Sequence, residues 1–305
     1  MKHIFIINPA AGKYDKTEEY SAQIRSVFAK RQDEYAICVS RFAGDCRNIA
    51  AEYAASGEEV RLYACGGDGT LNEVVNGAVG FPNAAVTHWP GGSGNDTIKM
   101  FSDPGAFRDL ERLADGEETK LDLIRCGDTW SVNILSIGFD AKVGTDITRF
   151  KRLPLVSGKG AYILSIIANI LHGLSEHYVV TINGETVDAE QTVICICNGR
   201  WYGGGFNPVP DAEPDDGLLD VLLVKKMGLF RALAVIGHYQ KGEYKNYPEL
   251  IRHEQCTALT IESDGESVVN VDGEAIYTKK AEIELVPGAI RFFYPKGLTF
   301  HCGQN

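Results

Sequence analysis

Short apolar runs alternate with longer amphipathic segments over the first 120 residues, and no other feature of the chain constrains its fold as strongly. Strands are predicted at 2–7, 35–40, 59–64 and 85–89, and helices at 17–31, 45–55 and 71–78. Strands separated by helices of this length form βαβ units with a parallel sheet. Residues 1–120 are therefore predicted to form a Rossmann-like α/β domain.

The pattern changes near residue 121, where short strands and tight turns replace the alternation. Strands are predicted at 120–125, 129–137, 178–182, 186–197, 218–224, 258–261, 267–271, 281–285 and 290–293, and helices at 159–171 and 229–239. The turns Cys126-Gly127-Asp128 and Asn183-Gly184 each join two of these strands, and Asn-Gly is the strongest short hairpin signal. Residues 121–293 are therefore predicted to form a mainly antiparallel β domain.

Composition limits the classes of protein to which the chain can belong. Its 305 residues, 44% hydrophobic and 23% charged, describe an ordinary globular chain long enough for two domains. The net charge of −11 argues against a general nucleic-acid binder and against broad attraction to anionic membranes. The eight cysteines include no C-x-x-C pair, which favours buried free thiols in a reducing compartment.

The N-terminus and the apolar runs predict a cytoplasmic protein. The start MKHIFIINPAAG resembles neither a signal peptide nor a membrane span. The longest nearly apolar run, 161–171, is far shorter than the roughly 20 residues that a spanning helix needs.

Three of the predicted strands end in unusual loops: Asn8–Lys13, Gly66–Gly69 and Pro90–Asp96. Because the carboxyl ends of parallel strands meet at one edge of a sheet, these loops are expected to converge on one ligand. In the second loop, glycines allow close approach of the backbone to an anion. The following Thr70-Leu71-Asn72-Glu73 has the form of a capping box, so a helix is expected to begin at Thr70. A tight turn is the plain alternative, and Asp68 among the glycines favours phosphate binding.

The loop Pro90–Asp96 repeats this arrangement, with Ser93 as a hydroxyl donor and Asp96 as a candidate helix cap. A serine-hydrolase elbow requires G-x-S-x-G, and Asn95 stands where its last glycine should be, so a nucleophilic serine is not predicted. The phosphate loop G-x-x-x-x-G-K-[ST] is absent, and no G-x-G-x-x-G opens the first helix. Both absences argue against the P-loop and dinucleotide-binding classes.

Two acidic segments lie in the second half. Asp215 and Asp216 occur in a loop rich in glycine and proline, where carboxylates and carbonyls can bind a hard cation or simply form a turn. Val271-Asp272-Gly273-Glu274 has the form of a hairpin turn, and by itself a bare turn is the favoured interpretation.

Taken together, these segments resemble the diacylglycerol kinase catalytic family. The resemblance rests on GGDGTLNEVVNG (66–77), PGGSGND (90–96), SVNILSIGFDA (131–141), NGRWYGGGF (198–206), PDAEPDDGLLDV (210–221) and VDGE (271–274). Their order and spacing are similar to those of the soluble bacterial lipid kinases, which are themselves similar to sphingosine and ceramide kinases. GGDGT alone is less specific, because NAD kinases also carry it.

The resemblance implies a nucleotide-binding α/β domain, joined by residues 294–305, and a β-sandwich-like domain, with the active site between them. The residues implied at the nucleotide are Asn8, Ala10, Gly12, Ser40, Gly66, Gly67, Asp68, Gly69, Thr70, Glu73 and Ser93, the last where the family usually has threonine. Magnesium would be held by Asp216 with backbone oxygens of Glu213 and Leu218, and by Asp68 through water. Glu274 or Asp272 would accept the proton of the lipid hydroxyl, with a slight preference for Glu274.

The function implied is an ATP- and magnesium-dependent lipid kinase that transfers the γ-phosphate to a lipid hydroxyl. Diacylglycerol is the first expected acceptor, which would give phosphatidic acid for phospholipid biosynthesis. Its expected partners are a lipid with a free hydroxyl and, transiently, a membrane surface, but no nucleic acid. The alternatives are another GGDGT kinase similar to NAD kinase, or a lipid-binding regulatory protein without catalysis. The sequence leaves three questions open: which lipid accepts the phosphate, whether ATP or GTP donates it, and whether the chain forms a homodimer.

An acidic enzyme that acts on a membrane lipid is expected to dock through a local patch. Arg149–Leu155 interleaves basic and apolar residues before the predicted helix 159–171, although a core helix with a solvated loop is favoured there. A second and weaker candidate for membrane contact is Lys225–Arg231.

Overall fold

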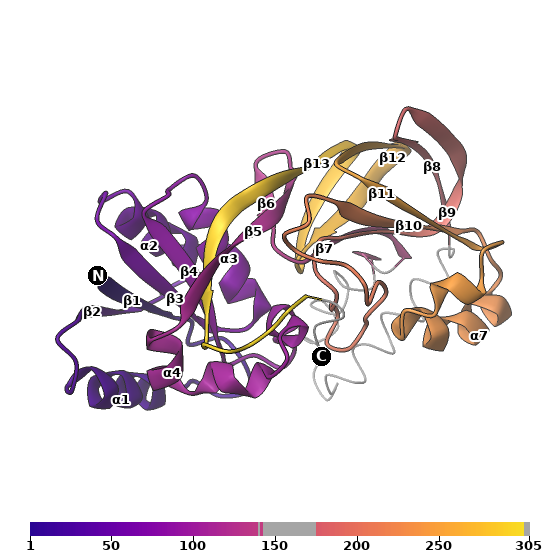
Figure 1. Cartoon of the computed structure of the whole chain (residues 1–305). Helices are drawn as coiled ribbons and strands as arrows, with labels where there is room; N and C mark the ends of the chain where they lie inside the picture. The colour runs from indigo at the N-terminus through magenta and orange to yellow at the C-terminus, as the bar shows by residue number, and fades with distance from the viewer. Residues whose placement is uncertain (140, 143–174, 302–305) are drawn as a thin grey trace. The chain divides into compact units, whose positions relative to one another are not determined.

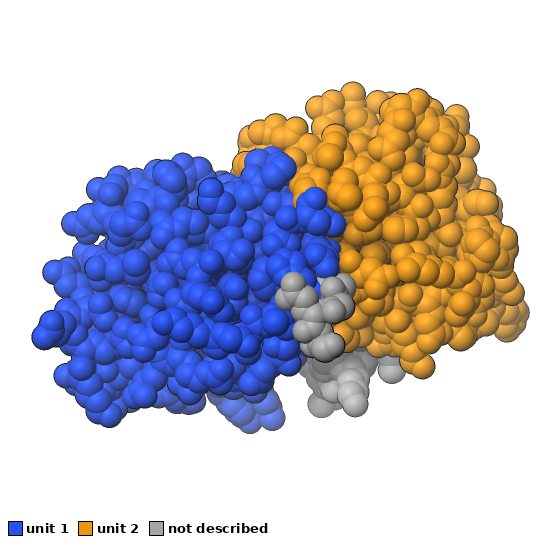
Figure 2. Space-filling model, in the orientation of Figure 1, with its two compact units in different colours: residues 1–123, 213–216, 286–305 blue, residues 124–212, 217–285 orange. Residues whose placement is uncertain are grey.

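The computed structural model describes residues 1–139, 141–142 and 175–301, and the chain divides into two compact units (Figure 2). Unit 1 comprises Met1–Leu123, Glu213–Asp216 and Val286–Asn305, and unit 2 comprises Ile124–Ala212 and Gly217–Leu285. The short segment Glu213–Asp216 groups with unit 1 rather than with its neighbours in the chain, which the sequence pattern did not predict. The basic segment 149–155 and the helix 159–171 lie outside the described residues.

Unit 1 contains a sheet of parallel strands (Figure 1). Its strands are β1 (Lys2–Ile7), β2 (Glu34–Val39), β3 (Val60–Gly66) and β4 (Ala84–Pro90), in the order β4-β3-β1-β2. β3 and β4 are buried along their whole length, as expected for parallel strands that helices cover on both faces. At the other side of β4, Arg291 and Phe292 of β13 (Glu274–Tyr294) pair in parallel with Ala85 and Val86.

Helices follow the strands of this sheet, as the alternation predicts. They are α1 (Thr17–Phe28), α2 (Asp45–Ala54) and α3 (Asp68–Ala78). Three further short pieces, η1 (Thr97–Met100), η2 (Pro104–Arg108) and α4 (Leu110–Ala114), were not predicted, because none is long enough to show a helical period. Each of the last two begins at an aspartate whose side chain accepts a backbone N–H group of the first turn, Asp103 and Asp109 respectively.

Unit 2 is built from antiparallel strands around two apolar cores. The strands are β6 (Thr129–Ser131), β7 (Ile134–Gly138), β8 (Glu176–Ile182), β9 (Glu185–Cys197), β10 (Leu219–Lys225), β11 (Ile251–Cys256) and β12 (Ala258–Val271), with the ends of β5 (Glu117–Cys126) and β13. The described residues of unit 2 include the helix α7 (Leu229–Gln240) and the short η3 (Tyr244–Asn246). None of the helices in the described residues is long and apolar enough to cross a membrane.

Both predicted hairpins are present. Cys126 pairs with Thr129 across Gly127-Asp128, and Ile182 pairs with Glu185 across Asn183-Gly184. Asn183 and Gly184 both have positive φ, 50° and 77°, the backbone that a two-residue hairpin turn requires and that these residue types adopt readily.

Five of the predicted strands were wrong in their bounds. The predicted strand 129–137 is interrupted between β6 and β7, where backbone N–H groups donate to the carboxylate of Asp272 instead of to a neighbouring strand. The predicted strands 258–261 and 267–271 are one strand, β12, with an irregular register between Glu262 and Ser267. Strands 281–285 and 290–293 are both parts of the 21-residue β13, which passes from unit 2 into unit 1.

The cysteines in the described residues are free thiols, as predicted. Seven lie in the described part of the chain, six buried and Cys38 half-buried, and none forms a disulfide with another of them. Burial raises the pKa of the Cys46 and Cys256 thiols to about 11, so these side chains act as small apolar groups in the core.

Candidate active site

The loops that follow β1, β3 and β4 meet at the carboxyl edge of the parallel sheet. Asn8 N–H donates to the carbonyl oxygen of Cys65 (3.1 Å), which ties the first loop to the second. Gly91 N–H and Gly92 N–H both donate to the carbonyl oxygen of Gly66, at 2.6 and 3.2 Å, which ties the third loop to the second. The expected convergence of these loops is therefore observed in unit 1.

Several glycines in these loops are required by contacts between the loops themselves. A Cβ atom at Gly12 would lie 2.6 Å from the carbonyl oxygen of Gly91, and one at Gly92 would lie 2.5 Å from the Cα atom of Gly67. Both neighbours are backbone atoms, which cannot move aside at small cost. Gly69 differs, because a Cβ atom there would meet nothing within 4 Å. The absence of a side chain at Gly69 therefore leaves space that a ligand can occupy.

The helix after the second loop begins earlier than the capping-box prediction placed it. Gly67 is the N-cap, with extended backbone, and its carbonyl oxygen accepts Thr70 N–H (3.0 Å) and Leu71 N–H (3.1 Å). Thr70 therefore lies inside the first turn of α3, where its Oγ1 accepts a hydrogen bond from Asn8 Nδ2 (3.1 Å). The capping-box prediction was wrong because the glycine before Asp68 already provides the turn into the helix.

Glu73 binds the start of a different helix. Its two carboxylate oxygens accept Gly44 N–H and Cys46 N–H, each at 3.1 Å, at the N-terminus of α2. A carboxylate in this position satisfies backbone donors and complements the positive end of the helix dipole. Its predicted return to Thr70 is not observed, and the side chain serves the packing of α2 against α3.

Asp68 fastens the third loop and caps the helical turn that follows it. Its Oδ1 accepts Asp96 N–H (2.5 Å) and Thr97 N–H (3.4 Å), at the start of η1. Its Oδ2 lies beside Gly94, where an added Cβ atom would be only 2.8 Å away. Asp96, the predicted cap, instead pairs through Oδ1 with Lys99 Nζ (2.5 Å). The helix cap thus comes from the second loop, and one oxygen of Asp68 is committed to structure.

His88 is a member of this site that the sequence did not reveal. It lies fully buried on β4, and its Nε2 donates to the carbonyl oxygen of Gly66 (2.9 Å), the same oxygen that accepts from Gly91 and Gly92. Its Nδ1 is buried and finds no partner among the described residues. Burial lowers the pKa of His88, which keeps the ring neutral. This residue belongs to no recognised motif, and a histidine within an apolar strand is interpreted from sequence as an ordinary core residue.

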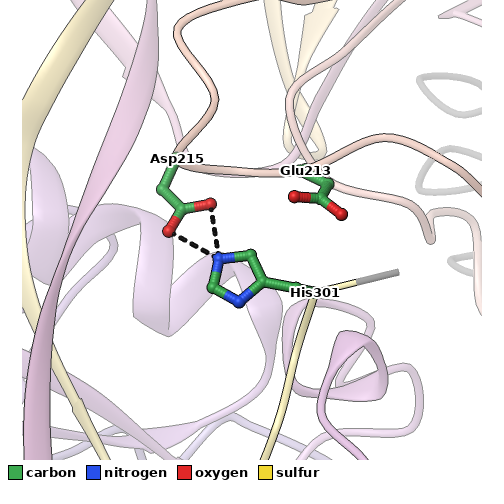
Figure 3. A group of neighbouring side chains, drawn as sticks. All are labelled: Glu213, Asp215 and His301. Carbon is green, nitrogen blue, oxygen red and sulfur yellow. Dashed lines mark hydrogen bonds and ion pairs between the residues drawn. The ribbon is translucent and has the colours of Figure 1, made fainter. Parts of the chain in front are cut away.

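A second cluster of polar groups in unit 1 combines two carboxylates and an imidazole. The ligand atoms of Glu213, Asp215 and His301 lie within 4.8 Å of one another, and all three residues are half-buried. His301 Nε2 pairs with both oxygens of Asp215, at 2.9 and 3.1 Å, and Glu213 lies beside this pair (Figure 3). This is the one group of three such side chains found in the described ranges, and Asp68 is not a member.

The predicted magnesium set is only partly represented in this cluster. Glu213 belongs to it, whereas Asp216 is exposed and Leu218 belongs to unit 2. Asp122 N–H donates to the carbonyl oxygen of Pro214 (2.7 Å), and Asp122 Oδ1 accepts Gly288 N–H (2.7 Å), which holds the segment within unit 1. His301 was missed because it lies far along the chain from the acidic loop and outside every recognised motif.

In unit 2, the two candidate bases at the β12–β13 turn have different surroundings. Asp272 and Gly273 form the turn with positive φ, 47° and 97°. The carboxylate of Asp272 accepts Val132 N–H (2.7 Å) and Asn133 N–H (3.2 Å) on Oδ2, and Ile134 N–H (2.9 Å) on Oδ1.

These contacts separate the roles that Asp272 and Glu274 can take. Burial raises the pKa of the Asp272 carboxyl to about 6, and its three backbone hydrogen bonds oppose that rise. Glu274, the first residue of β13, has an exposed side chain. Asp272 is therefore suited to hold the β6–β7 connection in place, and Glu274 differs from it in having an exposed side chain.

The comparisons with known proteins agree with this layout. Residues 2–126 match the model of the diacylglycerol kinase catalytic domain, and residues 133–294 match the model of the YegS C-terminal NAD kinase beta sandwich-like domain. The fold and the matched domains define a lipid kinase with a catalytic domain followed by a β-sandwich-like domain. The chain belongs to the diacylglycerol kinase catalytic family, in its YegS-like branch.

Individual relatives give the same result. The chain is 30% identical over 278 residues to the "Probable lipid kinase YegS-like" of Shewanella frigidimarina, covering 89% of this chain and 88% of that one. It is 26% identical over 248 residues to a "Putative lipid kinase" of Staphylococcus epidermidis, covering 81% and 80%. The crystal structure of "a putative diacylglycerol kinase" from Bacillus anthracis has a TM-score of 0.76, with 22% identity and 98% of both chains covered, and shares the fold.

Proposed function

We propose that this chain is an ATP- and magnesium-dependent kinase that transfers the γ-phosphate to a lipid hydroxyl, with diacylglycerol as the first expected acceptor. The observation that carries the proposal is the meeting of three glycine-containing loops at the start of α3, joined through the carbonyl oxygens of Cys65 and Gly66. Membership of a lipid kinase family supports the same chemistry. Phosphoryl transfer relies on positioning and on charge neutralisation, and this arrangement can supply both.

The nucleotide is assigned to the loop edge of unit 1. The N-terminus of α3 carries the positive end of a helix dipole and faces the loops, which favours a phosphate there. Gly69 and Ser93 are exposed at this edge and are assigned to contact the phosphates, Ser93 through its hydroxyl. The first loop, with Asn8, Ala10 and Gly12, and the buried Ser40 after β2 are assigned to the rest of the nucleotide.

Magnesium is assigned to oxygen ligands, which it prefers. In the acidic loop the cation is assigned to Asp216, with backbone oxygens of Glu213 and Leu218, and the exposure of Asp216 supports this assignment. Asp68 would contact magnesium through water with Oδ2, because Oδ1 already accepts two backbone N–H groups. When bound, the cation neutralises charge on the transferred phosphate.

Glu274 is assigned as the proton acceptor. The lipid hydroxyl oxygen forms a bond to the γ-phosphorus, the bond to the β–γ bridging oxygen breaks, ADP leaves, and the hydroxyl proton passes to the Glu274 carboxylate. The support for Glu274 is its exposed side chain, and the three backbone hydrogen bonds of the Asp272 carboxylate support a structural role for that residue.

The test is transfer of labelled γ-phosphate from Mg-ATP to diacylglycerol, a sphingoid base and a polyprenol in mixed micelles, with NAD as a control acceptor. We expect labelled diacylglycerol, and a loss of roughly 10²- to 10⁴-fold in the Glu274→Gln variant. Labelled NAD would instead favour an NAD kinase activity. This alternative is retained because residues 133–294 match a domain described as NAD kinase beta sandwich-like. Binding of lipid without any transfer would favour a non-catalytic lipid-binding protein.

A further inference from the structure

Helix α7 of unit 2 (Figure 1) carries large apolar side chains that are exposed. Phe230, Leu233 and Ile236 are 88%, 60% and 42% exposed, although they lie within seven residues of one another. The opposite side of the same helix is packed, because Val235 and Tyr239 are buried in an apolar core. A helix of a globular protein normally turns its apolar side inward. The second, exposed apolar face of α7 therefore indicates a surface that binds a partner.

Basic side chains lie at the N-terminal end of this face. Lys225 Nζ donates to the backbone carbonyl oxygen of Glu249 (3.1 Å), which carries no net charge. Lys226 pairs with Glu190 (2.6 Å) and Arg231 with the Glu249 carboxylate (2.8 Å). Three cations against two carboxylates leave one positive charge in excess here, although the whole chain carries −11. The apolar face therefore adjoins a group of three basic side chains that are paired with only two carboxylates.

We propose that α7 is a membrane-docking helix that lies in the plane of an anionic lipid bilayer. Phe230, Leu233 and Ile236 enter the boundary between headgroups and acyl chains, and Lys225 and Lys226 contact lipid phosphates. A helix with an apolar face and cations beside it binds a bilayer through buried apolar area together with attraction to anionic lipids. This inference rests on the proposed function, because a lipid kinase has to reach a hydroxyl group held in a membrane.

The size of the face distinguishes a bilayer from a second copy of the chain. A helix of 12 residues is only about 18 Å long at 1.5 Å per residue. A stable protein–protein interface buries about 800 Å² on each partner, and one exposed face of so short a helix supplies a small part of that area. A bilayer has no such requirement, because each inserted side chain contributes separately.

The experiment is co-sedimentation of the full chain with vesicles of phosphatidylcholine, with and without phosphatidylglycerol. We expect binding that the Phe230→Ser/Leu233→Ser double variant weakens by at least about tenfold, since two apolar side chains no longer insert. The Lys225→Ser/Lys226→Ser variant should lose affinity only for vesicles that contain phosphatidylglycerol. The control is Tyr277→Ser, which removes a side chain of 58% exposure on β13 of the same unit and should bind like the unchanged protein.

A second measurement decides the question if a variant fails to fold. In the Phe230→Trp variant, vesicles should shift the added tryptophan emission to the blue, and brominated lipids should quench it. The proposal is overturned if the unchanged protein does not bind vesicles, if the double variant binds equally well, or if the double variant dissociates a dimer seen by light scattering. Sedimentation requires no turnover, so a failure of docking and a failure of phosphoryl transfer in micelles are separate results.

Discussion

His88 donates from Nε2 to the carbonyl oxygen of Gly66 over 2.9 Å, beneath the loops that end β3 and β4. The same oxygen accepts the N–H groups of Gly91 and Gly92. A buried strand residue thus supports the backbone that is assigned to the nucleotide. The remaining nitrogen of the ring has no partner in the described part of the chain, so the ring contributes this one hydrogen bond and its packing.

Replacing His88 should therefore damage both stability and nucleotide affinity. In His88→Phe, the loss of a buried donor should lower the free energy of unfolding by about 1–3 kcal/mol and raise KM for ATP more than it lowers kcat. Urea unfolding and steady-state kinetics measure the two effects. His88→Gln can keep a donor and should recover part of both. Unchanged stability and KM in His88→Phe would show that the hydrogen bond to Gly66 is dispensable.

Two glycines of the loops should respond in opposite ways to alanine. Gly69→Ala has space for its methyl group and lies in the first turn of α3, so stability should hold or rise by up to about 1 kcal/mol, while nucleotide affinity falls. Gly92→Ala would place Cβ against the Cα atom of Gly67, so stability should fall by about 1–3 kcal/mol. Urea unfolding and ATP titration of both variants measure these changes. If Gly69→Ala and Gly92→Ala lowered the free energy of unfolding equally, the assignment of Gly69 to the nucleotide would be contradicted.

The two acidic residues of the β12–β13 turn should separate stability from catalysis. Asp272→Asn should lower the free energy of unfolding by about 1–3 kcal/mol, because the amide nitrogen cannot accept the backbone N–H groups that the carboxylate holds. Because the Glu274 side chain is exposed, Glu274→Gln should change the free energy of unfolding by less than about 0.5 kcal/mol, and it should remove transfer activity because an amide cannot accept the hydroxyl proton. Thermal unfolding and phosphoryl transfer measured side by side provide the comparison. If Asp272→Asn were stable but inactive, the roles of the two residues would be exchanged.

Stability should depend on pH through His3. Burial lowers the pKa of His3 to about 4 from an ordinary value of 6.5. Between these values the unfolded chain binds the proton and the folded chain does not, so the free energy of unfolding falls as the pH is lowered. The loss should total about 3 kcal/mol from pH 6.5 to pH 4. His3→Gln should flatten this part of the curve, as measured by urea unfolding, and an identical slope in the variant would rule out His3 as its source.

Local patterns predicted the elements whose causes lie close together in the chain. The alternation in the first 120 residues gave the parallel strand pairs, and Asn183-Gly184 gave its hairpin, because both residues adopt positive φ easily. The family motifs located the loops, and the structure shows that these loops meet.

Contacts between distant residues explain what could not be predicted. The spacing of Thr70 and Glu73 fitted a capping box, but the partners of Glu73 are backbone groups near residue 45, and no local pattern announces them. The break after Ser131 is caused by Asp272, about 140 residues later in the chain. His301 and Asp215 are separated by 86 residues and pair only after folding.

The carbonyl oxygen of Gly66, as a shared hydrogen-bond acceptor, determines how the loops open. Because one oxygen receives Gly91 N–H, Gly92 N–H and the His88 ring, the loops cannot separate without breaking these hydrogen bonds together. Opening of this edge should therefore be an all-or-none event, and the amide hydrogens of Gly91 and Gly92 should exchange with deuterium at one common rate. A bound triphosphate would slow the exchange of both amide hydrogens by the same factor. The exchange rate of Gly91 and Gly92 would therefore report how long the nucleotide stays bound.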